Sequence, residues 1–398
     1  MTKRQRRSVA VSLFLAAAMA MALPFFSFGE NRTGSEDSDF SELLSEPEIE
    51  EFGLEEIEEY LGQNQPEGIR LSFTELAKDI LAGDFKQAGI KVGTAVRDGL
   101  VSEVGQGSRL LIQVMLLGLV GAVFSGFSGV FSGSQISETG FFVTYLLLFT
   151  CLAAGFYQSL KIASDVLNHL LNFMKVLLPA FFLAVAFSGG SISSGALYET
   201  TLGMIGIFQG ICLMAGLPLI KMYALLVLAG KISREDSISR LTELIGQIVR
   251  WGLKTMVGLM MGFQLIQAMV LPSLDAAGQT GLIRLIEAVP GVGQGARSVT
   301  QVILGSGVLI KNSIGAAGAV VIGAIAVLPL LKLAVLALLY HGAAALLEPV
   351  CDKRVVSCIQ GISEAHKLLI HLIWTALLLF AVSLAIVCAS TNVTYFAG

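Results

Sequence analysis

Two lysines in strongly apolar parts of the chain occupy the same position in a repeated five-residue pattern. Leu-Pro-Leu-Ile-Lys covers residues 217–221, and Leu-Pro-Leu-Leu-Lys covers residues 328–332. Each pattern has a helix breaker, Pro218 or Pro329, followed one turn later by Lys221 or Lys332. A cation near the bilayer centre costs about 3 kcal/mol unless it reaches the headgroups or faces protein or water. The four residues are therefore candidates either for a membrane edge, with snorkelling lysines, or for a polar face in a pore or subunit contact.

Other reactive side chains form no recognised catalytic or ligand-binding pattern. The four histidines have no metal-ligand spacing to one another or to cysteine, so we expect no metal site. A phosphate-binding GxxxxGK[ST] loop is absent, and Gly291, Gly293 and Ala296 fit a dinucleotide-binding spacing without the acidic residue that should follow. That stretch favours a loop and an amphipathic helix ending near residues 305–307. We predict no cofactor, no catalytic residue and no enzymatic activity.

The composition identifies the class of protein that must position these residues. Apolar residues make up 54% of the 398 positions and charged residues 14%, with a mean hydropathy of +0.76, which indicates an all-α, multi-pass membrane protein. Residues 30–60 contain 13 acidic side chains and one basic residue, Arg32, so the acidity is local. No segment is basic enough for a nucleic-acid surface.

The amino-terminal region divides into three parts. Residues 1–26 have a basic start, an apolar run and small residues, as in a signal peptide, although an uncleaved first helix would have similar features. Residues 27–66 are predicted to be an acidic flexible tether, with room for a short acidic helix. Residues 67–109 are predicted to form amphipathic extracytoplasmic helices, beginning where Ser72 and Glu75 form a capping box. Residues 110–398 are the predicted transmembrane domain.

The transmembrane domain is predicted to contain five to seven membrane-spanning segments. Since about 20 helical residues cross a bilayer, five segments are clear from their apolar length: 110–131, 141–160, 169–188, 251–271 and 368–389. Two longer runs, 201–230 and 312–340, contain the two proline patterns and are predicted to be kinked or broken helices. A broken segment in lipid needs neighbouring protein or water to satisfy its freed backbone groups. The sidedness of residues 201–345 is left open.

Pairs of glycines at GxxxG spacing occur along the predicted spans. Small residues at this spacing let helix backbones approach closely in membranes. The pairs predict tight helix contacts, either within the chain or between copies of it, and are Gly129/Gly133, Gly206/Gly210 and Gly258/Gly262.

The chain resembles the stage III sporulation protein AE family of endospore-forming bacteria over nearly its whole length. The resemblance rests on "LPLIKMYALLVLAGKIS", "AVPGVGQGARSVTQVILGSGVLIKNSIGAAGAVV", "LPLLKLAVLALLYHGAAALLEPVCDKR" and "GISEAHKLL", and its most specific part is residues 281–370. The positions that match are the two proline patterns and "VLIKN" at 308–312. No catalytic residue is carried over.

This resemblance implies a place in the sporulation channel complex that links the mother cell to the engulfed forespore. The implied location is the mother-cell membrane around the forespore. The implied partners are other proteins of the stage III sporulation A operon, including a separate ATPase and ring-forming proteins between the two membranes. Together with the residues, it favours a non-enzymatic channel subunit in which Pro218, Lys221, Pro329 and Lys332 line or shape a polar interior. The alternative is a stand-alone small-molecule permease with two pseudo-repeats.

Overall fold

A computed structural model describes residues 54–64, 72–82, 112, 116, 135–188, 191–230, 237–287 and 293–392. Its elements in these ranges are all helices. In chain order they are α4 (Leu54–Asn64), α5 (Phe73–Leu81), α7 (Gln135–Phe187), α8 (Ser191–Ile211), a π-helical turn (Cys212–Gly216), α9 (Leu217–Gly230), α10 (Ser237–Glu287), α11 (Gly293–Leu347) and α12 (Lys353–Asn392). This confirms the predicted all-α fold class.

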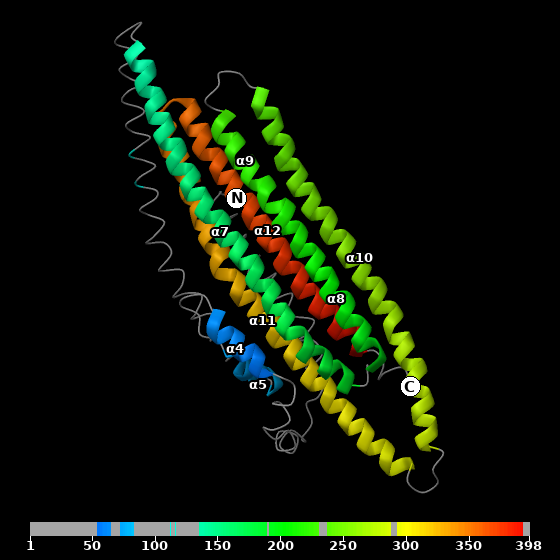
Figure 1. The fold of residues 1–398 in the computed structure, drawn as a ribbon. Helices are drawn as coiled ribbons and strands as arrows, with labels where there is room; N and C mark the ends of the chain where they lie inside the picture. The colour runs from blue at the N-terminus through cyan, green and yellow to red at the C-terminus, as the bar shows by residue number, and fades with distance from the viewer. Residues whose placement is uncertain are drawn as a thin grey trace, which may run out of the picture.

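The long helices form a bundle in which neighbours alternate in direction (Figure 1). Helices α7, α10 and α12 run one way, and the α8–α9 pair and α11 run the other way. Helix α12 lies centrally and contacts α7, α9, α10 and α11. Its apolar side chains fill the core, where Leu369, Leu372, Ile373, Ala376 and Phe380 are fully buried. Because lipid tails are as apolar as these side chains, the close packing of α12 against its neighbours holds the bundle together.

Four helical segments in the described part of the chain are long and apolar enough to cross a membrane: Phe142–Phe187, Gly195–Gly230, Gly305–Leu347 and Lys353–Ala389. They confirm a multi-pass membrane protein. The predicted span 251–271 lies within α10, including residues whose side chains are not described. The predicted span 110–131, like the signal peptide and most of the tether, lies outside the described residues except for two isolated positions.

The predicted separation of spans 141–160 and 169–188 is wrong, because both belong to the single helix α7. The charged residues Lys161 and Asp165 lie at the boundary between the two predicted spans, and both are exposed on one face. The opposite face keeps Ala163, Leu167 and Leu170 in the core. A helix whose polar residues share one side has no physical reason to end there.

The two prolines have different effects on their helices. Before Pro218 the chain forms the π-helical turn, in which the Leu217 N–H donates to the Cys212 carbonyl. A π turn is a known way to change the hydrogen-bond register beside a residue that has no N–H. At Pro329, by contrast, α11 remains α-helical throughout. The interruption at Pro218 is a change of helix type. The break predicted at Pro329 is not present, and the alternative, a kink there, stays a prediction.

Helices α4 and α5 form a small unit that packs on the side of α7 and α11 (Figure 1). Ser72 is the N-cap of α5 and accepts a hydrogen bond from the Glu75 N–H, as predicted. Glu58 of α4 accepts hydrogen bonds from the backbone N–H groups of Phe73 (2.8 Å) and Thr74 (3.2 Å), which places a carboxylate at the positive end of α5.

The contact of this unit with α7 centres on Phe173. The rings of Tyr60 and Phe73 both lie 6.4 Å from the Phe173 ring. The Tyr60 hydroxyl donates to the backbone carbonyl of His169 (3.1 Å), and burial raises the pKa of Tyr60 to about 12. These contacts fix the height of α4 along α7.

Close helix packing uses glycines outside the GxxxG pairs. A Cβ atom at Gly318 would lie 2.5 Å from the Leu177 side chain, and one at Gly361 would collide with Val227. A Cβ at Gly307 would lie 2.9–3.0 Å from the backbone of Phe187 and Ser188. The sequence predicted that a helix ends near residues 305–307, and this prediction is wrong. They lie within α11 and let the end of α7 approach it.

Candidate functional site

Lys221 and Pro218 lie on the outer surface of α9. Both side chains are exposed, and the Lys221 ammonium is 6.0 Å from the centre of the Tyr157 ring on α7. This distance is at the outer limit of a cation–π contact. The Tyr157 side chain is itself 63% exposed. Lys221 therefore points along the bundle surface toward α7, and the bundle interior does not enclose it.

Lys332 and Pro329 are half-buried on α11. Two close contacts give their height relative to α7: a Cβ at Gly155 would lie 2.9 Å from the Tyr340 hydroxyl, and Gly318 approaches Leu177. Since α7 and α11 run in opposite directions, these two contacts place Lys332 at the height of α7 residues near Ala163. Tyr157, which lies beside Lys221, is less than two helical turns away.

The two proline patterns therefore flank α7 at nearly the same height, one on α9 and one on α11. The structure brings the two lysines to one level of the bundle, but it places them on different helices and gives them different exposure. No contact between them is seen in the described part of the chain. This arrangement can place positive charge around α7 at one height.

The GxxxG pairs that the structure describes face away from the neighbouring helices. A Cβ at Gly206, Gly210, Gly258 or Gly262 would meet nothing within 4 Å. Within one chain, then, these pairs do not make the predicted contact, and contact between copies stays a prediction. Gly129 and Gly133 lie outside the described residues.

Lys311 is a fully buried cation that the sequence analysis did not single out. It lies one turn from Gly307, which abuts the end of α7, and one turn from Gly315, where a Cβ would lie 2.6 Å from the Cys388 sulfur of α12. Lys311 thus faces the carboxyl-terminal ends of α7 and α12. Helix ends of this kind carry unpaired carbonyls and partial negative charge, which stabilise a cation. Its signal in the sequence was a lone charge in the "VLIKN" segment.

His366 and Ser159 form a second buried polar group, at the contact of α12 with α7. Their side chains lie 2.9 Å apart, and His366 Nδ1 lies 2.8 Å from the Ile362 carbonyl. Nδ1 therefore donates to a carbonyl, leaving Nε2 to accept from the serine hydroxyl. The rings of Phe156 and Tyr340 pack against the imidazole at 5.3 and 5.2 Å. A backbone carbonyl orients this histidine, and two aromatic rings pack against it.

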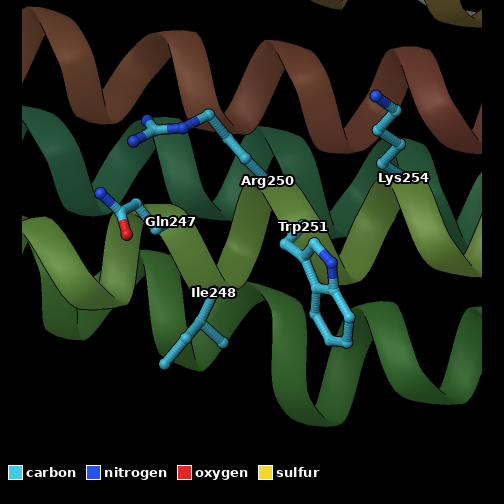
Figure 2. Close-up of a pocket in the computed structure, with 5 residues that line it drawn as sticks. All are labelled: Gln247, Ile248, Arg250, Trp251 and Lys254. Atoms are coloured by element: carbon cyan, nitrogen blue, oxygen red, sulfur yellow. The ribbon is translucent and has the colours of Figure 1, made fainter.

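Two depressions occur along α10. One is a groove between α9, α10 and α12 whose charged lining residues are Glu243, Arg250 and Glu364, a mixture that selects no single ligand charge. The other is shallow and open, and Figure 2 shows Arg250 and Lys254 on one side of α10 with Ile248 and Trp251 on the other. Trp251 is 71% exposed. Among the described residues, no three His, Cys, Asp or Glu side chains are grouped as metal ligands.

Comparison with known proteins gives one consistent result. Residues 71–391 match the family model described as stage III sporulation protein AE. The chain is also 23% identical over 296 residues to the stage III sporulation protein AE of Bacillus subtilis (strain 168), an alignment that covers 74% of each chain. No solved structure matches significantly.

Proposed function

Because the chain belongs to the stage III sporulation protein AE family, we propose that it is a non-enzymatic subunit of the channel complex that connects mother cell and forespore. The family implies a role in sporulation, and four helices able to cross a membrane make the chain a multi-pass membrane protein. The proposed location is the mother-cell membrane around the forespore. The proposed partners are the separate ATPase and the ring-forming intermembrane proteins of the same operon.

The observation that carries this proposal is the position of the two lysines. Lys221 is exposed on α9 at the level where the exposed apolar surface of α8 ends, so its charge can contact headgroups, water or a polar partner. Lys332 lies at nearly the same height on the other side of α7. We propose that the two patterns, with Pro218 and Pro329, shape a polar region of the complex next to α7.

The double variant Lys221→Ala and Lys332→Ala tests this role. We expect it to reduce spore yield after engulfment, with the amount of protein in the membrane unchanged, because positive charge is lost at one level of the complex. Lys367→Ala is a matched control, since Lys367 is exposed and pairs with Glu364 on the same helix. Normal spore yield from the double variant would reject the polar-region role.

Purification separates the channel subunit from a stand-alone permease. The tagged chain is isolated in mild detergent from cells that have completed engulfment. A stable complex containing the operon's ATPase and ring-forming proteins supports the proposal. Isolation of the chain alone, together with solute uptake by the chain alone in liposomes, would support the permease.

A further inference from the structure

Helix α7 carries a continuous polar stripe on its outer face. The stripe consists of Lys161, Asp165, Asn168, Asn172 and Lys175, all of which are exposed. Their separations of four, three, four and three residues place them on one side of a helix. The opposite side of the same stretch is buried in the core by Leu167, Leu170 and Phe173. The stripe is therefore a defined surface of the bundle.

At the same height, the α8 side of the bundle is apolar. Two contacts set this height: Tyr157 of α7 lies beside Lys221 of α9, and Phe182 of α7 packs on Tyr198 of α8. The stripe lies between these contacts along α7. Between Glu199 and Lys221, the exposed residues of the α8–α9 pair are all apolar or glycine: Gly203, Gly206, Ile207, Ile211, Met214 and Pro218. Glu199 and Lys221 are 22 positions apart, which corresponds to about 33 Å of helix, close to the hydrocarbon thickness of a bilayer.

Helix α10 continues the apolar surface. Two contacts through α12 set its height relative to α8. Gln264 of α10 donates a hydrogen bond to Ser383 of α12. One turn away on α12, Phe380 packs on Phe208 of α8. The exposed residues of α10 around Gln264 are again apolar or glycine: Gly258, Leu259, Met261, Gly262, Phe263, Leu265 and Ile266. One side of the bundle is thus suited to lipid at the depth where the other side carries charges.

The exposed acidic face of α4 independently favours water on the α7 side. Helix α4 docks on α7 at His169 and Phe173, which lie within the stretch that carries the stripe. Its outward residues Glu55, Glu56 and Glu59 are exposed. Three carboxylates on two turns of helix are stable only in contact with water or cations. The polar environment of α7 therefore extends beyond α7 itself.

We infer that the α7 stripe and the acidic face of α4 line a water-filled passage at the depth where α8 and α10 face lipid. This inference rests on the proposed function, because it assigns the surface along which a channel subunit would conduct polar solutes. The physical reason is that lipid tails cannot solvate Lys161, Asp165 and Lys175, whereas the exposed residues of α8 and α10 at that depth are apolar or glycine. Both charge signs occur along the stripe itself, and the three exposed carboxylates of α4 add negative charge to the lining of the passage.

Cysteine accessibility in membranes tests the passage. Asn168→Cys and Asn172→Cys place a thiol on the stripe, and Ile207→Cys and Leu259→Cys place one on the apolar side at a similar height. Each variant of the full chain is treated, in freeze–thawed vesicles, with a charged membrane-impermeant thiol reagent that reaches both aqueous phases. Labelling is counted above that of the unsubstituted chain, which contains five native cysteines. All four variants should label equally in denaturing detergent.

We expect the two stripe positions to react roughly tenfold or more faster than the two apolar positions, because a charged reagent needs water to reach its target. Unreactive stripe positions would overturn the inference, since protein would then cover the stripe. Equal, fast reaction at all four positions would also overturn it, because the α8 and α10 faces would then not be in lipid. Neither failure changes the purification result that tests membership of the complex, so the two proposals fail separately.

Discussion

At the scale of single residues, Asp352 shows how the turn between α11 and α12 is held. Its carboxylate accepts a hydrogen bond from the Arg354 N–H (2.8 Å) and lies 3.3 Å from the Arg354 guanidinium. Burial on its own would raise the pKa of Asp352, but the hydrogen bonds and positive charge of Arg354 outweigh it and lower the pKa. The ionised form is therefore the one that stabilises the start of α12.

The Asp352 contact gives a prediction with a definite pH dependence. A carboxyl group with a lowered folded-state pKa contributes stability above its unfolded pKa of about 3.9, and this contribution is lost as the pH falls through the folded pKa. Asp352→Ala should therefore destabilise the protein by roughly 1 kcal/mol at pH 7 and have a smaller effect at pH 3. Thermal unfolding in detergent at both pH values measures this. Asp352→Asn is the control, since asparagine caps helices equally well. An alanine effect of equal size at pH 3 would contradict the ionic role.

At the scale of helices, the sequence predicted element type well and element boundaries less well. Apolar length was enough to find the helices around 201–230, 312–340 and 368–389, because it reports a property of every residue in the run. It failed at residues 161–169, where charges on one face of α7 look the same in a linear sequence as charges in a loop. The polar residues of this stretch recur every three or four positions, and this spacing indicates one continuous helix.

The candidate site was predictable only in part, for a similar reason. The proline patterns could be recognised from a repeated string, but their common height beside α7 depends on how α9 and α11 pack. Lys311 could be seen as a lone charge, yet its burial between two helix ends is a tertiary property. The GxxxG spacing identified Gly206 and Gly258, whereas the glycines in close contact, such as Gly318 and Gly361, depend on which neighbour each one faces.

The contrast between these two kinds of glycine predicts opposite effects of alanine. At Gly361 a methyl group collides with Val227, a buried β-branched residue that cannot easily rotate away in a helix. Gly361→Ala should lower stability by about 1–3 kcal/mol. At Gly206 the space is open, so Gly206→Ala should be neutral or stabilising by up to about 1 kcal/mol. Thermal unfolding of both variants in detergent compares them, and equal destabilisation would show that Gly206 also packs against a helix.

At the scale of the whole molecule, the bundle is longer than a bilayer is thick. Helices α7, α10 and α11 contain 53, 51 and 55 residues, or about 80 Å each at 1.5 Å per residue. The hydrocarbon layer measures about 30 Å, and tilt alone cannot absorb this difference. The helices run side by side for much of their length (Figure 1), so part of the bundle must stand outside the hydrocarbon.

The edge of the membrane should lie at Trp251. Exposed residues of α10 before this point include Arg240, Glu243 and Arg250, whereas from Gly258 to Ile266 the exposed residues are apolar or glycine. An exposed tryptophan beside Lys254, as in Figure 2, is typical of a membrane–water interface. Lys221 of α9 lies at the matching end of the apolar face of α8, which independently gives the same level.

Lipid quenching of tryptophan fluorescence measures this depth directly. The chain has two tryptophans, so Trp374→Phe leaves Trp251 as the only one. In vesicles containing brominated lipids, Trp251 should be quenched most by bromine near the headgroups, because its ring lies at the interface. The Trp251→Phe variant is the control, since the remaining Trp374 is half-buried against the core and should be quenched less. Strongest quenching of Trp251 by bromine deep in the acyl chains would move the membrane along the bundle and bring Arg250 and Lys254 into hydrocarbon.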